Sequence, residues 1–524
     1  MAATTRSLPG AAATAPAPVG FPLRVGVVDV GSNAIRYQAC EFTAADRFSV
    51  LDSRRASVRL GHGVFLSGRL AEPAIEAAVA ALVSFVQAGT ALGITRWRAV
   101  ATSATREAAN GAELVARVKA AVGLELEAIS GAEEARLVHL AVANRVPLGR
   151  DPWWLVDLGG GSVEVSLADG SGVLWSESHT VGSVRLLEAL TQSDEEPGRF
   201  RELLEEYVSG LRLPSAERFG TPTGFIATGG NIEALARLGE PAAASDVTVY
   251  LPLARLRAVI DTLARLSFRQ RVDELGLRED RADVVLPAAM VYERLANLAG
   301  CSEIVVPFVG LKDGVALDFV DELTAARAHA DRQGRDTVAA ATALGRHYAF
   351  DEDHARKVAD LALSLFDQLS ERHGLGPRER RILLAAALLH EIGQFIGFKG
   401  HHKHTLYLLI HSDLAGFPPS EMELVANVAR YHRRSEPDPS HWAYAGLPSR
   451  DRSRVERLAA ILRVADALDR EHRQRVNRIE VSVSGKELTL RLVGEGDLLL
   501  ERHFLPARAA MLARVLGLKL RVRQ

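Results

Sequence analysis

Short apolar runs that end in glycine-rich polar turns recur through the first 310 residues of this chain. Runs of this kind, each long enough for one buried strand, lie at 23–28, 97–102, 153–156, 223–228 and 304–309. Between them, residues 71–92 and 252–299 carry apolar side chains at helical spacing. Strands that alternate with helices predict an α/β fold. In such folds, ligands bind at the carboxyl ends of the strands, where these turns lie.

Two of the strand ends share one pattern. An apolar strand is followed by Asp, an apolar residue, Gly and small polar residues in 29–33, and again from residue 157. The two copies stand about 130 residues apart. The repetition predicts an internal duplication, in which each half supplies one loop to a shared cleft.

The second copy is the segment around which we expect the site to form. Asp157 precedes three glycines and Ser162, and an alternating stretch with Glu164 follows, which predicts a strand, a tight turn and a strand. We expect the glycines to take positive φ and their N–H groups to form a concave anion site. Because carboxylates repel phosphate, the two acids predict a Mg²⁺ ion between them and a bound phosphate.

An arginine follows the strand 97–102. Thr102 or Ser103 is suited to cap a helix that begins there, and Arg106 lies in its first turn. A helix N-terminus with an arginine suits an anion. A further strand ends in Gly229-Gly230-Asn231 before a helix, and this turn is also suited to hold phosphate.

A pair of glutamates begins another predicted helix. Ser130 and Glu133 have the spacing of a capping box, which gives Glu133 a structural role at the helix start. Glu134 has no such local role. A carboxylate near the cleft is suited to act as a general base on water, and Glu134 is the candidate.

The composition argues against several classes of function. A net charge of −2 gives no general attraction to nucleic acid or to a membrane surface, and we see no run of about 20 apolar residues. Cys40 and Cys301 are far apart and lack the spacing of metal ligands, which favours a reducing compartment. Residues 1–22 are rich in Ala, Pro and Thr and predict a disordered leader, not a signal peptide. We therefore expect a cytoplasmic protein that binds neither nucleic acid nor a membrane.

Six motifs in one order, spread over about 200 residues, resemble those of the Ppx/GppA family of exopolyphosphatases and guanosine pentaphosphate phosphohydrolases. They are 29–33, 101–106, 129–136, 157–164, 182–185 and 227–231. The resemblance implies an actin-like ATPase fold, which is a duplicated ribonuclease H-like core with a cleft between two lobes. It also suggests a homodimer.

The same resemblance implies roles for individual residues. Glu134 matches the catalytic glutamate that activates water for in-line attack on the terminal phosphorus. Asp157 and Glu164 match the acids of the Mg²⁺ site. The phosphate-binding positions that match the family are Gly31, Ser32, Asn33, Arg106, Gly159, Gly160, Gly161 and Ser162. Gly229, Gly230 and Asn231 complete the predicted phosphate site. Phosphoryl transfer needs positioning, metal and positive charge more than covalent help, and these residue types supply them.

From about residue 321 the pattern becomes almost entirely helical, and residues 321–475 hold 12 of the 16 histidines. Residues 325–335 predict a linker or a first helix, and 383–396 predict a helix that carries His390-Glu391. This part resembles the HD-type helical domain of long Ppx/GppA members. Metal-dependent HD hydrolases use His, His-Asp and a distal Asp. Because Glu391 is one methylene longer than Asp, we expect a structural or phosphate-binding domain more than a metal centre, and the metal alternative stays open.

The chain ends in a predicted β-hairpin around Gly485-Lys486, a helix at 505–516 and a closing strand at 518–523. The expected organisation is therefore an α/β, actin-like two-lobed core followed by an all-α HD-like domain and a small α+β cap. The predicted ranges are a disordered leader at 1–22, lobe I at 23–140, lobe II at 141–320, the HD-like domain at 321–475 and the cap at 476–524.

The leading functional hypothesis is an exopolyphosphatase that releases orthophosphate from the ends of polyphosphate. A close alternative is hydrolysis of the 5′-γ-phosphate of guanosine pentaphosphate, because both reactions need the same terminal-phosphate site. A regulator that binds (p)ppGpp with little turnover belongs to a different class, and the intact Glu134 argues against it. An actin-like sugar kinase is a third interpretation, against which the 133–136 segment and the HD-like tail argue.

Overall fold

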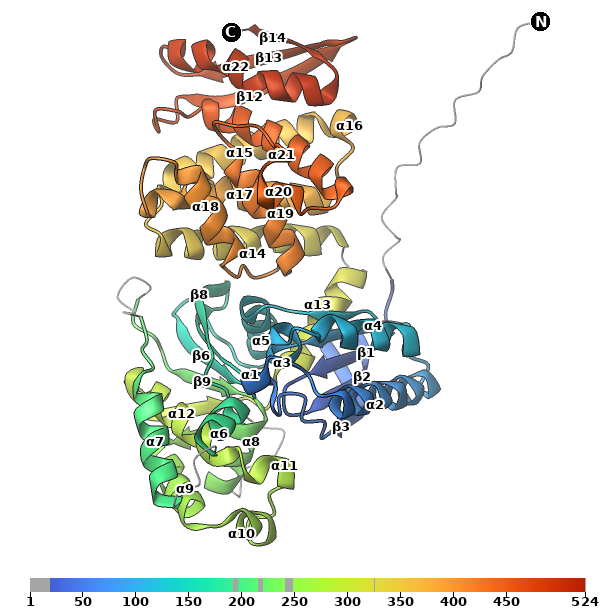
Figure 1. The fold of residues 1–524 in the computed structure, drawn as a ribbon, viewed down its shortest axis with the longest axis vertical. Coiled ribbons are helices and arrows are strands. Elements are labelled where there is room, and N and C mark those ends of the chain that lie inside the picture. Colours follow the sequence, from blue (N-terminus) through green and yellow to red (C-terminus); the bar gives the residue numbers. More distant parts are fainter. Residues whose placement is uncertain (1–18, 192–196, 215–219, 241–247, 325, 524) are drawn as a thin grey trace, which may run out of the picture.

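The computed structural model describes residues 19–523 except 192–196, 215–219, 241–247 and 325. The predicted leader therefore lies, up to residue 18, outside the described residues. Two α/β lobes lie side by side at one end of the molecule (Figure 1). A helical domain follows, and a small sheet with one long helix lies at the opposite end.

The first lobe is built on a five-stranded sheet of order β3-β2-β1-β4-β5. Its strands are β1 (Leu23–Val30), β2 (Ile35–Ala44), β3 (Arg47–Ala56), β4 (Trp97–Ala101) and β5 (Leu126–Ala128). The first three are antiparallel, whereas β1, β4 and β5 are parallel. Its helices are α1 (Val64–Ser67), α2 (Glu72–Ala91), α3 (Ser103–Glu107) and α4 (Gly111–Val122).

The second lobe repeats this topology. Its sheet has the order β10-β11-β9-β6-β7-β8. The strands are β6 (Trp153–Leu158), β7 (Val163–Asp169), β8 (Gly172–His179), β9 (Phe225–Thr228), β10 (Val249–Pro252) and β11 (Glu303–Val306). Strands β6 to β8 are antiparallel and β6, β9 and β11 are parallel, as in the first sheet, and β10 adds one edge strand. The predicted duplication and the actin-like fold are confirmed.

The helices of the second lobe cover this sheet. They are α6 (Ser183–Thr191), α7 (Pro197–Ser209), α8 (Gly230–Gly239), α9 (Leu253–Arg265), α10 (Phe268–Asp273), α11 (Glu279–Ala282) and α12 (Val285–Leu298). The loop after β1 and the loop after β6 hold equivalent places in the two sheets. The two Asp-x-Gly turns therefore belong to the same structural position of a repeated unit.

Helices α5 (Gly131–Arg145) and α13 (Leu311–Thr324) join the two lobes. They pack against each other and contribute to one apolar cluster that contains Val27 of β1, Leu155 of β6 and Val305 of β11. The helices approach so closely that a Cβ on Gly314 would lie 1.8 Å from the carbonyl oxygen of Leu137. Although α13 falls mostly in the range predicted for lobe II, it packs on the sheet of the first lobe.

Within the described residues, α2 is the helix that is long and apolar enough to cross a membrane by length and composition. Its buried residues recur at helical spacing. Ile75, Ala78, Leu82 and Phe85 belong to the core of the first lobe, and Gly89 is buried near the end of the helix. Gly89 packs on Trp97, where a Cβ would lie 2.3 Å from the ring. We assign α2 to the core of the lobe.

The helical domain forms one apolar core around α17 (Pro377–Leu389). Its other elements are α14 (Ala326–His347), α15 (Glu352–Gln368), α16 (Ser370–His373), the 3₁₀ turn η2 (Ile392–Phe395), α18 (His401–Ile410), α19 (Pro419–Arg430), α20 (Trp442–Ala445) and α21 (Ser449–Ala467). The segment 325–335 is helical from residue 326. The helix predicted at 383–396 ends at Leu389, so that His390 is its C-cap and Glu391 lies outside it.

The C-terminal cap has the predicted elements. Strands β12 (Val476–Ser484) and β13 (Glu487–Gly494) form the hairpin, and β14 (Lys519–Arg523) pairs with β13 in parallel. Helix α22 (Leu499–Leu516) packs on α21 of the helical domain.

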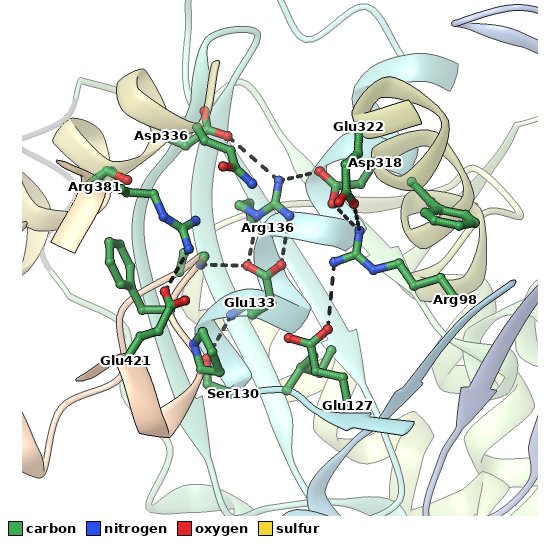
Figure 2. A pocket seen from close by; sticks show the side chains of 18 of the residues that line it. Arg98, Glu127, Ser130, Glu133, Arg136, Asp318, Glu322, Asp336, Arg381 and Glu421 are labelled. Atoms are coloured by element: carbon green, nitrogen blue, oxygen red, sulfur yellow. Dashed lines mark hydrogen bonds and ion pairs between the residues drawn. The ribbon is translucent and has the colours of Figure 1, made fainter. Parts of the chain in front are cut away.

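The helical domain contacts the first lobe at the start of α5 (Figure 2). Ser130 accepts a hydrogen bond from the Glu133 N–H, but the Glu133 side chain does not return it, so only half of the predicted capping box forms. Instead, the Glu133 carboxylate binds Arg136 at 2.8 and 2.9 Å and accepts a hydrogen bond from the Gly416 N–H at 2.7 Å. Arg136 also donates to Asp318 of α13 at 3.0 Å. The residue next to Glu134 is therefore fixed by the helical domain.

Candidate functional site

A cavity of about 350 Å³ lies between the two lobes. It is lined by the loops after β1 and β6, by the start of α8 and by the start of α13. Most of the predicted site residues line it: Gly31, Ser32, Asn33, Glu134, Asp157, Gly159, Gly160, Gly229, Gly230 and Asn231. The structure thus brings together segments that lie about 200 residues apart in the chain.

The glycines of the second loop serve close approach and not positive φ. The backbone of Gly159, Gly160 and Gly161 stays outside the positive-φ region that the sequence predicted for them. A Cβ on Gly160 would lie 2.9 Å from the Cβ of Ser32 in the opposite loop, and one on Gly161 would lie 2.3 Å from the ring of Phe65. A side chain at Gly160 would push the two loops apart, and one at Gly161 would displace Phe65 of α1. Gly229 differs, with φ at 101°.

In each loop, the N–H of the first glycine donates a hydrogen bond to a carbonyl three residues later in the same loop. The Gly31 N–H donates to the Ala34 carbonyl at 3.1 Å, and the Gly159 N–H donates to the Ser162 carbonyl at 3.0 Å. The next two N–H groups of each loop donate to no group in the part of the chain that the structure describes; they belong to Ser32, Asn33, Gly160 and Gly161. Adjacent free N–H groups from two facing loops form an anion site.

Three buried carboxylates lie beside these loops. Glu134, Asp157 and Glu164 each offer one oxygen within 4.8 Å of the others. Asp157 and Glu164 are directly opposite each other in the register of β6 and β7, a position at which like charges are destabilising. One oxygen each of Glu134 and Glu164 is buried without a hydrogen-bond partner. A cation between the three groups would offset the repulsion between Asp157 and Glu164 and would bind the unpartnered oxygens of Glu134 and Glu164.

The pKa values of these carboxyl groups reflect their burial. Burial raises the pKa of Glu134 well above its ordinary value, and the neighbouring Glu164 and Asp157 raise it further. Burial also raises the pKa of Glu164, to about 7, although Ser162 donates a hydrogen bond to it at 2.7 Å. The pKa of Asp157 is raised by burial and lowered in part by the hydrogen bond from Thr228 at 2.6 Å. This set of oxygen ligands fits a hard divalent cation such as Mg²⁺.

The cavity lining also contains basic residues that the sequence did not predict. They are Arg36, Arg55, Arg237, Arg281 and Lys312, and Asp29, Glu233 and Asp313 line the same cavity. Arg36 donates to Asp29 at 3.0 Å, its direct partner across β1 and β2. Arg281 forms no side-chain hydrogen bond or ion pair with any residue that the structure describes, and burial together with Arg278 and Arg36 lowers its pKa to about 10. A guanidinium held among other cations is suited to bind an anionic group.

Four predicted residues lie behind the cavity lining. Arg106 donates to the Ile129 carbonyl at 2.7 Å and lies 4.0 Å from the free oxygen of Glu134. Ser162 holds Glu164, and Gly161 packs on Phe65. Glu164, the fourth, reaches the carboxylate cluster from β7. Arg106 and Ser162 position the acids, and none of the four is among the described residues that line the cavity itself.

The helix α3 supports the first loop. Thr102 is its N-cap but makes no side-chain capping bond. The Ser103 and Ser32 hydroxyls are hydrogen-bonded at 2.9 Å, so the helix start fixes the loop after β1. The predicted capping role is thus replaced by a contact with the loop.

Contacts across the cleft join the first lobe to Asp280 and Asp283 of the second lobe. Asn33 donates from its amide to the Asp280 carbonyl at 2.7 Å, and Arg55 pairs with the Asp280 carboxylate. Arg59 pairs with Asp283 at 2.7 Å. In this arrangement the two loops, the carboxylate cluster and the arginines surround one cavity that fits a phosphate group with a bound cation.

Comparison with known proteins gives consistent matches. The model of the Ppx/GppA phosphatase family matches residues 41–323, and the model of Ppx/GppA phosphatase, domain III, matches residues 336–508. A guanosine-5'-triphosphate,3'-diphosphate pyrophosphatase of Photobacterium profundum is 26% identical over 478 residues, which is 89% of this chain and 90% of the relative.

Solved structures match the two lobes. An exopolyphosphatase from Cytophaga hutchinsonii ATCC 33406 is 27% identical, covers 57% of this chain and 99% of its own, and has a TM-score of 0.54. An exopolyphosphatase-like protein is 26% identical, covers 56% of this chain and 97% of its own, and has a TM-score of 0.50.

Proposed function

Because this chain belongs to the Ppx/GppA phosphatase family, we propose that it is an exopolyphosphatase, which hydrolyses the terminal phosphoanhydride of inorganic polyphosphate and releases orthophosphate. The observation that carries the proposal is the meeting of two glycine loops beside a buried cluster of three carboxylates. The loops supply free N–H groups for the terminal phosphate. The carboxylates supply a base and the ligands of a cation.

In the proposed reaction, the free N–H groups of both loops bind the oxygens of the terminal phosphate. Glu134 accepts a proton from a water molecule as the water oxygen attacks the terminal phosphorus, and the bond from that phosphorus to the bridging oxygen breaks. Arg281 and Lys312 balance the negative charge of the displaced phosphate chain. Mg²⁺, held by Asp157 and Glu164 when it is bound, would neutralise charge on the phosphate oxygens.

The cavity lining favours polyphosphate over a nucleotide. Phe308 is the one aromatic side chain in the described lining, which also contains the glycine loops, four arginines, Lys312 and five carboxylates. A phosphate chain with a bound cation needs only such donors and cation ligands, while a base is usually held by stacking and by specific hydrogen bonds. Hydrolysis of the 5′-γ-phosphate of guanosine pentaphosphate is the second candidate, because the pyrophosphatase relative matches this chain through the helical domain as well.

We propose a Mg²⁺ cofactor, a cytoplasmic location and a homodimer, with no role for nucleic acid or a membrane. The cofactor is supported by the carboxylate cluster. The location is supported by the low cysteine content, and the dimer by family resemblance alone. A regulator that binds (p)ppGpp without turnover remains a third candidate, against which the buried, unpartnered oxygen of Glu134 argues.

The test compares orthophosphate release from long-chain polyphosphate, guanosine pentaphosphate and ATP, each with excess Mg²⁺. We expect kcat/KM for polyphosphate to exceed that for pentaphosphate by about tenfold or more, a difference of about 1.4 kcal/mol in barrier. A preference for pentaphosphate would support the second candidate. Tight binding of pentaphosphate with no release from any substrate would support the regulator.

A further inference from the structure

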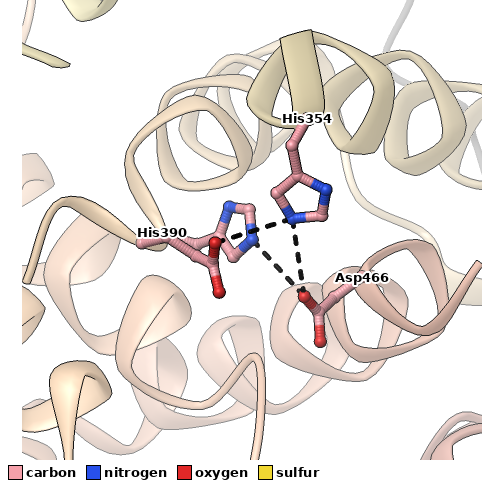
Figure 3. A group of neighbouring side chains, drawn as sticks. His354, His390 and Asp466 are labelled. Carbon is pink, nitrogen blue, oxygen red and sulfur yellow. Dashed lines mark ion pairs between the residues drawn. The ribbon is translucent and has the colours of Figure 1, made fainter. Parts of the chain in front are cut away.

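The core of the helical domain contains a second cluster of metal-ligand side chains, remote in sequence from the cleft residues (Figure 3). Six residues from five parts of the domain meet there: His354, His390, Glu391, His401, His432 and Asp466. All four histidines are at most 2% exposed, and the two acids are partly buried. The proposed hydrolysis in the cleft uses none of them.

The six side chains form two groups that share Glu391. His354, His390, Glu391 and Asp466 each offer an atom within 4.8 Å of the others, and so do Glu391, His401 and His432. The His390 Nε2 lies 3.4 Å from an Asp466 oxygen, and the His401 Nε2 lies 3.5 Å from a Glu391 oxygen. Ligands at about 2.1 Å from one ion are about 3.0 Å apart in octahedral and about 3.4 Å apart in tetrahedral coordination. These two separations are close to the tetrahedral value. His354 Nε2 lies farther away, 3.8 Å from a Glu391 oxygen and 4.0 Å from an Asp466 oxygen, which is near the separation of about 4.2 Å between opposite ligands in octahedral coordination.

The hydrogen bonds of three of the histidines leave Nε2 as the ligand atom. Nδ1 of His390 lies 2.7 Å from the Ala387 carbonyl, and Nδ1 of His432 lies 2.7 Å from the Ala429 carbonyl. A carbonyl only accepts, so these Nδ1 atoms carry the proton and each Nε2 keeps its lone pair. Nδ1 of His354 lies 2.9 Å from the buried Asp469 carboxylate, which fixes the same tautomer. This carboxylate or carbonyl contact behind the ring is the usual support of a metal-binding histidine.

The ligand atoms themselves lack partners. Nε2 of His354, Nε2 of His390 and one oxygen of Glu391 are buried without a hydrogen bond in the described part of the chain. Nε2 of His401 and Nε2 of His432 are hydrogen-bonded at 3.2 Å, and Arg433 lies 3.3 Å from the same His401 atom. His432 accepts in this pair, because its Nδ1 carries the proton, and Nδ1 of His401 is buried without a partner in the described residues. A cation between the two rings would take the place of the shared proton, and a cation in the first group would bind its unpartnered atoms.

We propose that the helical domain binds two divalent transition-metal ions that share Glu391. His354, His390 and Asp466 hold the first ion, and His401 and His432 hold the second. Mixed imidazole and carboxylate ligands suit Mn²⁺, Fe²⁺, Co²⁺ or Zn²⁺, in contrast to the oxygen-only set of the cleft. The second ion binds more weakly, because it has fewer protein ligands and Arg433 must turn away from His401.

The longer side chain of Glu391 fits this site because α17 ends before it. Had the helix continued through 391, as the sequence pattern predicts, the helix would have fixed the position of its Cβ. The helix stops at Leu389 and Glu391 begins the 3₁₀ turn. The Glu391 side chain therefore extends from an irregular segment, and its carboxylate contacts both groups of ligands.

The test measures metal content of the full-length protein. The protein is stripped with a chelator, dialysed against Zn²⁺ with Mg²⁺ in excess, freed of unbound metal and analysed by mass spectrometry for zinc. We expect two Zn²⁺ per chain for the wild type and for two controls: Glu164→Gln in the cleft and His411→Gln, an exposed histidine of the same domain. We expect at most one for His432→Gln. For Asp466→Asn we expect less Zn²⁺ per chain than in the wild type, from a loss of affinity of tenfold or more, since the loss of a contact behind a ligand already costs that much.

Co²⁺ absorption provides a second measurement. Visible d–d bands of Co²⁺ bound to nitrogen ligands should appear in the wild type and in Glu164→Gln and be weakened in Asp466→Asn. Circular dichroism confirms that each variant is folded. Wild-type protein that binds no Zn²⁺ beyond what folded Asp466→Asn binds, or Zn²⁺ that is lost in Glu164→Gln and retained in Asp466→Asn, would overturn the proposal.

Discussion

Replacing Glu134 with glutamine lowers kcat for orthophosphate release from polyphosphate by about 10²- to 10⁴-fold, the contribution typical of a positioned general base. Glutamine keeps the shape of the side chain but cannot accept the proton of the attacking water. Since the wild-type carboxylate is buried among Asp157 and Glu164, the neutral amide does not weaken folding. Initial rates at saturating Mg²⁺, together with thermal unfolding of both proteins, measure the two effects.

Glu233→Gln is the matched control. Glu233 is a carboxylate of the same cavity but lies outside the three-acid cluster. The control removes the same charge from the cleft, so we expect its kcat to stay within about tenfold of the wild type. Equal kcat for Glu134→Gln and wild type, or equal losses for both variants, would remove the assignment of Glu134 as the base.

Replacing Glu164 with glutamine has two expected effects. It stabilises the metal-free protein at high pH, and it abolishes the stabilisation of the protein by Mg²⁺. The pKa of Glu164 rises from 4.5 to about 7 on folding. Between these values the folded state binds more protons than the unfolded chain, so the free energy of unfolding falls as pH rises through this range. Above about pH 7 the full penalty, on the order of 3 kcal/mol, remains. The neutral glutamine does not carry this penalty.

Thermal unfolding with a chelator, at about pH 5 and about pH 8, measures this difference. We expect the variant to unfold at a higher temperature than the wild type at the higher pH, with the difference largely gone at the lower pH. Added Mg²⁺ should raise the unfolding temperature of the wild type and leave that of the variant nearly unchanged. A pH-independent difference, or an equal response of both proteins to Mg²⁺, would contradict the assigned metal site. Phosphate release should fall with the loss of Mg²⁺.

The fold could be predicted from the sequence because the patterns that indicate it are formed by neighbouring residues. An apolar strand followed by Asp-x-Gly occurs twice, and both copies hold the same place in their sheets. The hairpin around Gly485 and the helix at 72–91 likewise depend on neighbouring residues. Glu134 emerged as a candidate because Ser130 and Glu133 already explained the helix start. Its neighbours from the other lobe are brought to it by the topology of the sheets.

Features that depend on tertiary contacts could not be predicted from the sequence. Glu133 binds Gly416 of another domain and so does not complete the capping box. Gly160 is required by the opposite loop and Gly161 by Phe65, and neither is required by its own backbone angles. Arg281 belongs to a short helix with no motif, and only the closure of the lobes places it in the cavity.

The histidines show the same limit. His401 and His432 lie in segments rich in basic residues, yet both are buried. Their environment depends on the packing of α18 against α19. No local pattern in either segment marks an inward-facing side chain.

The most direct test of the central claim is hydrolysis of polyphosphate in oxygen-18 water, followed by mass spectrometry of both products. The central claim is that water, deprotonated by Glu134, attacks the terminal phosphorus held between the two glycine loops. We expect one solvent oxygen in each released orthophosphate and none in the shortened chain during the first turnover. Solvent oxygen in the end group of the shortened chain, or release of pyrophosphate as the first product, would contradict it.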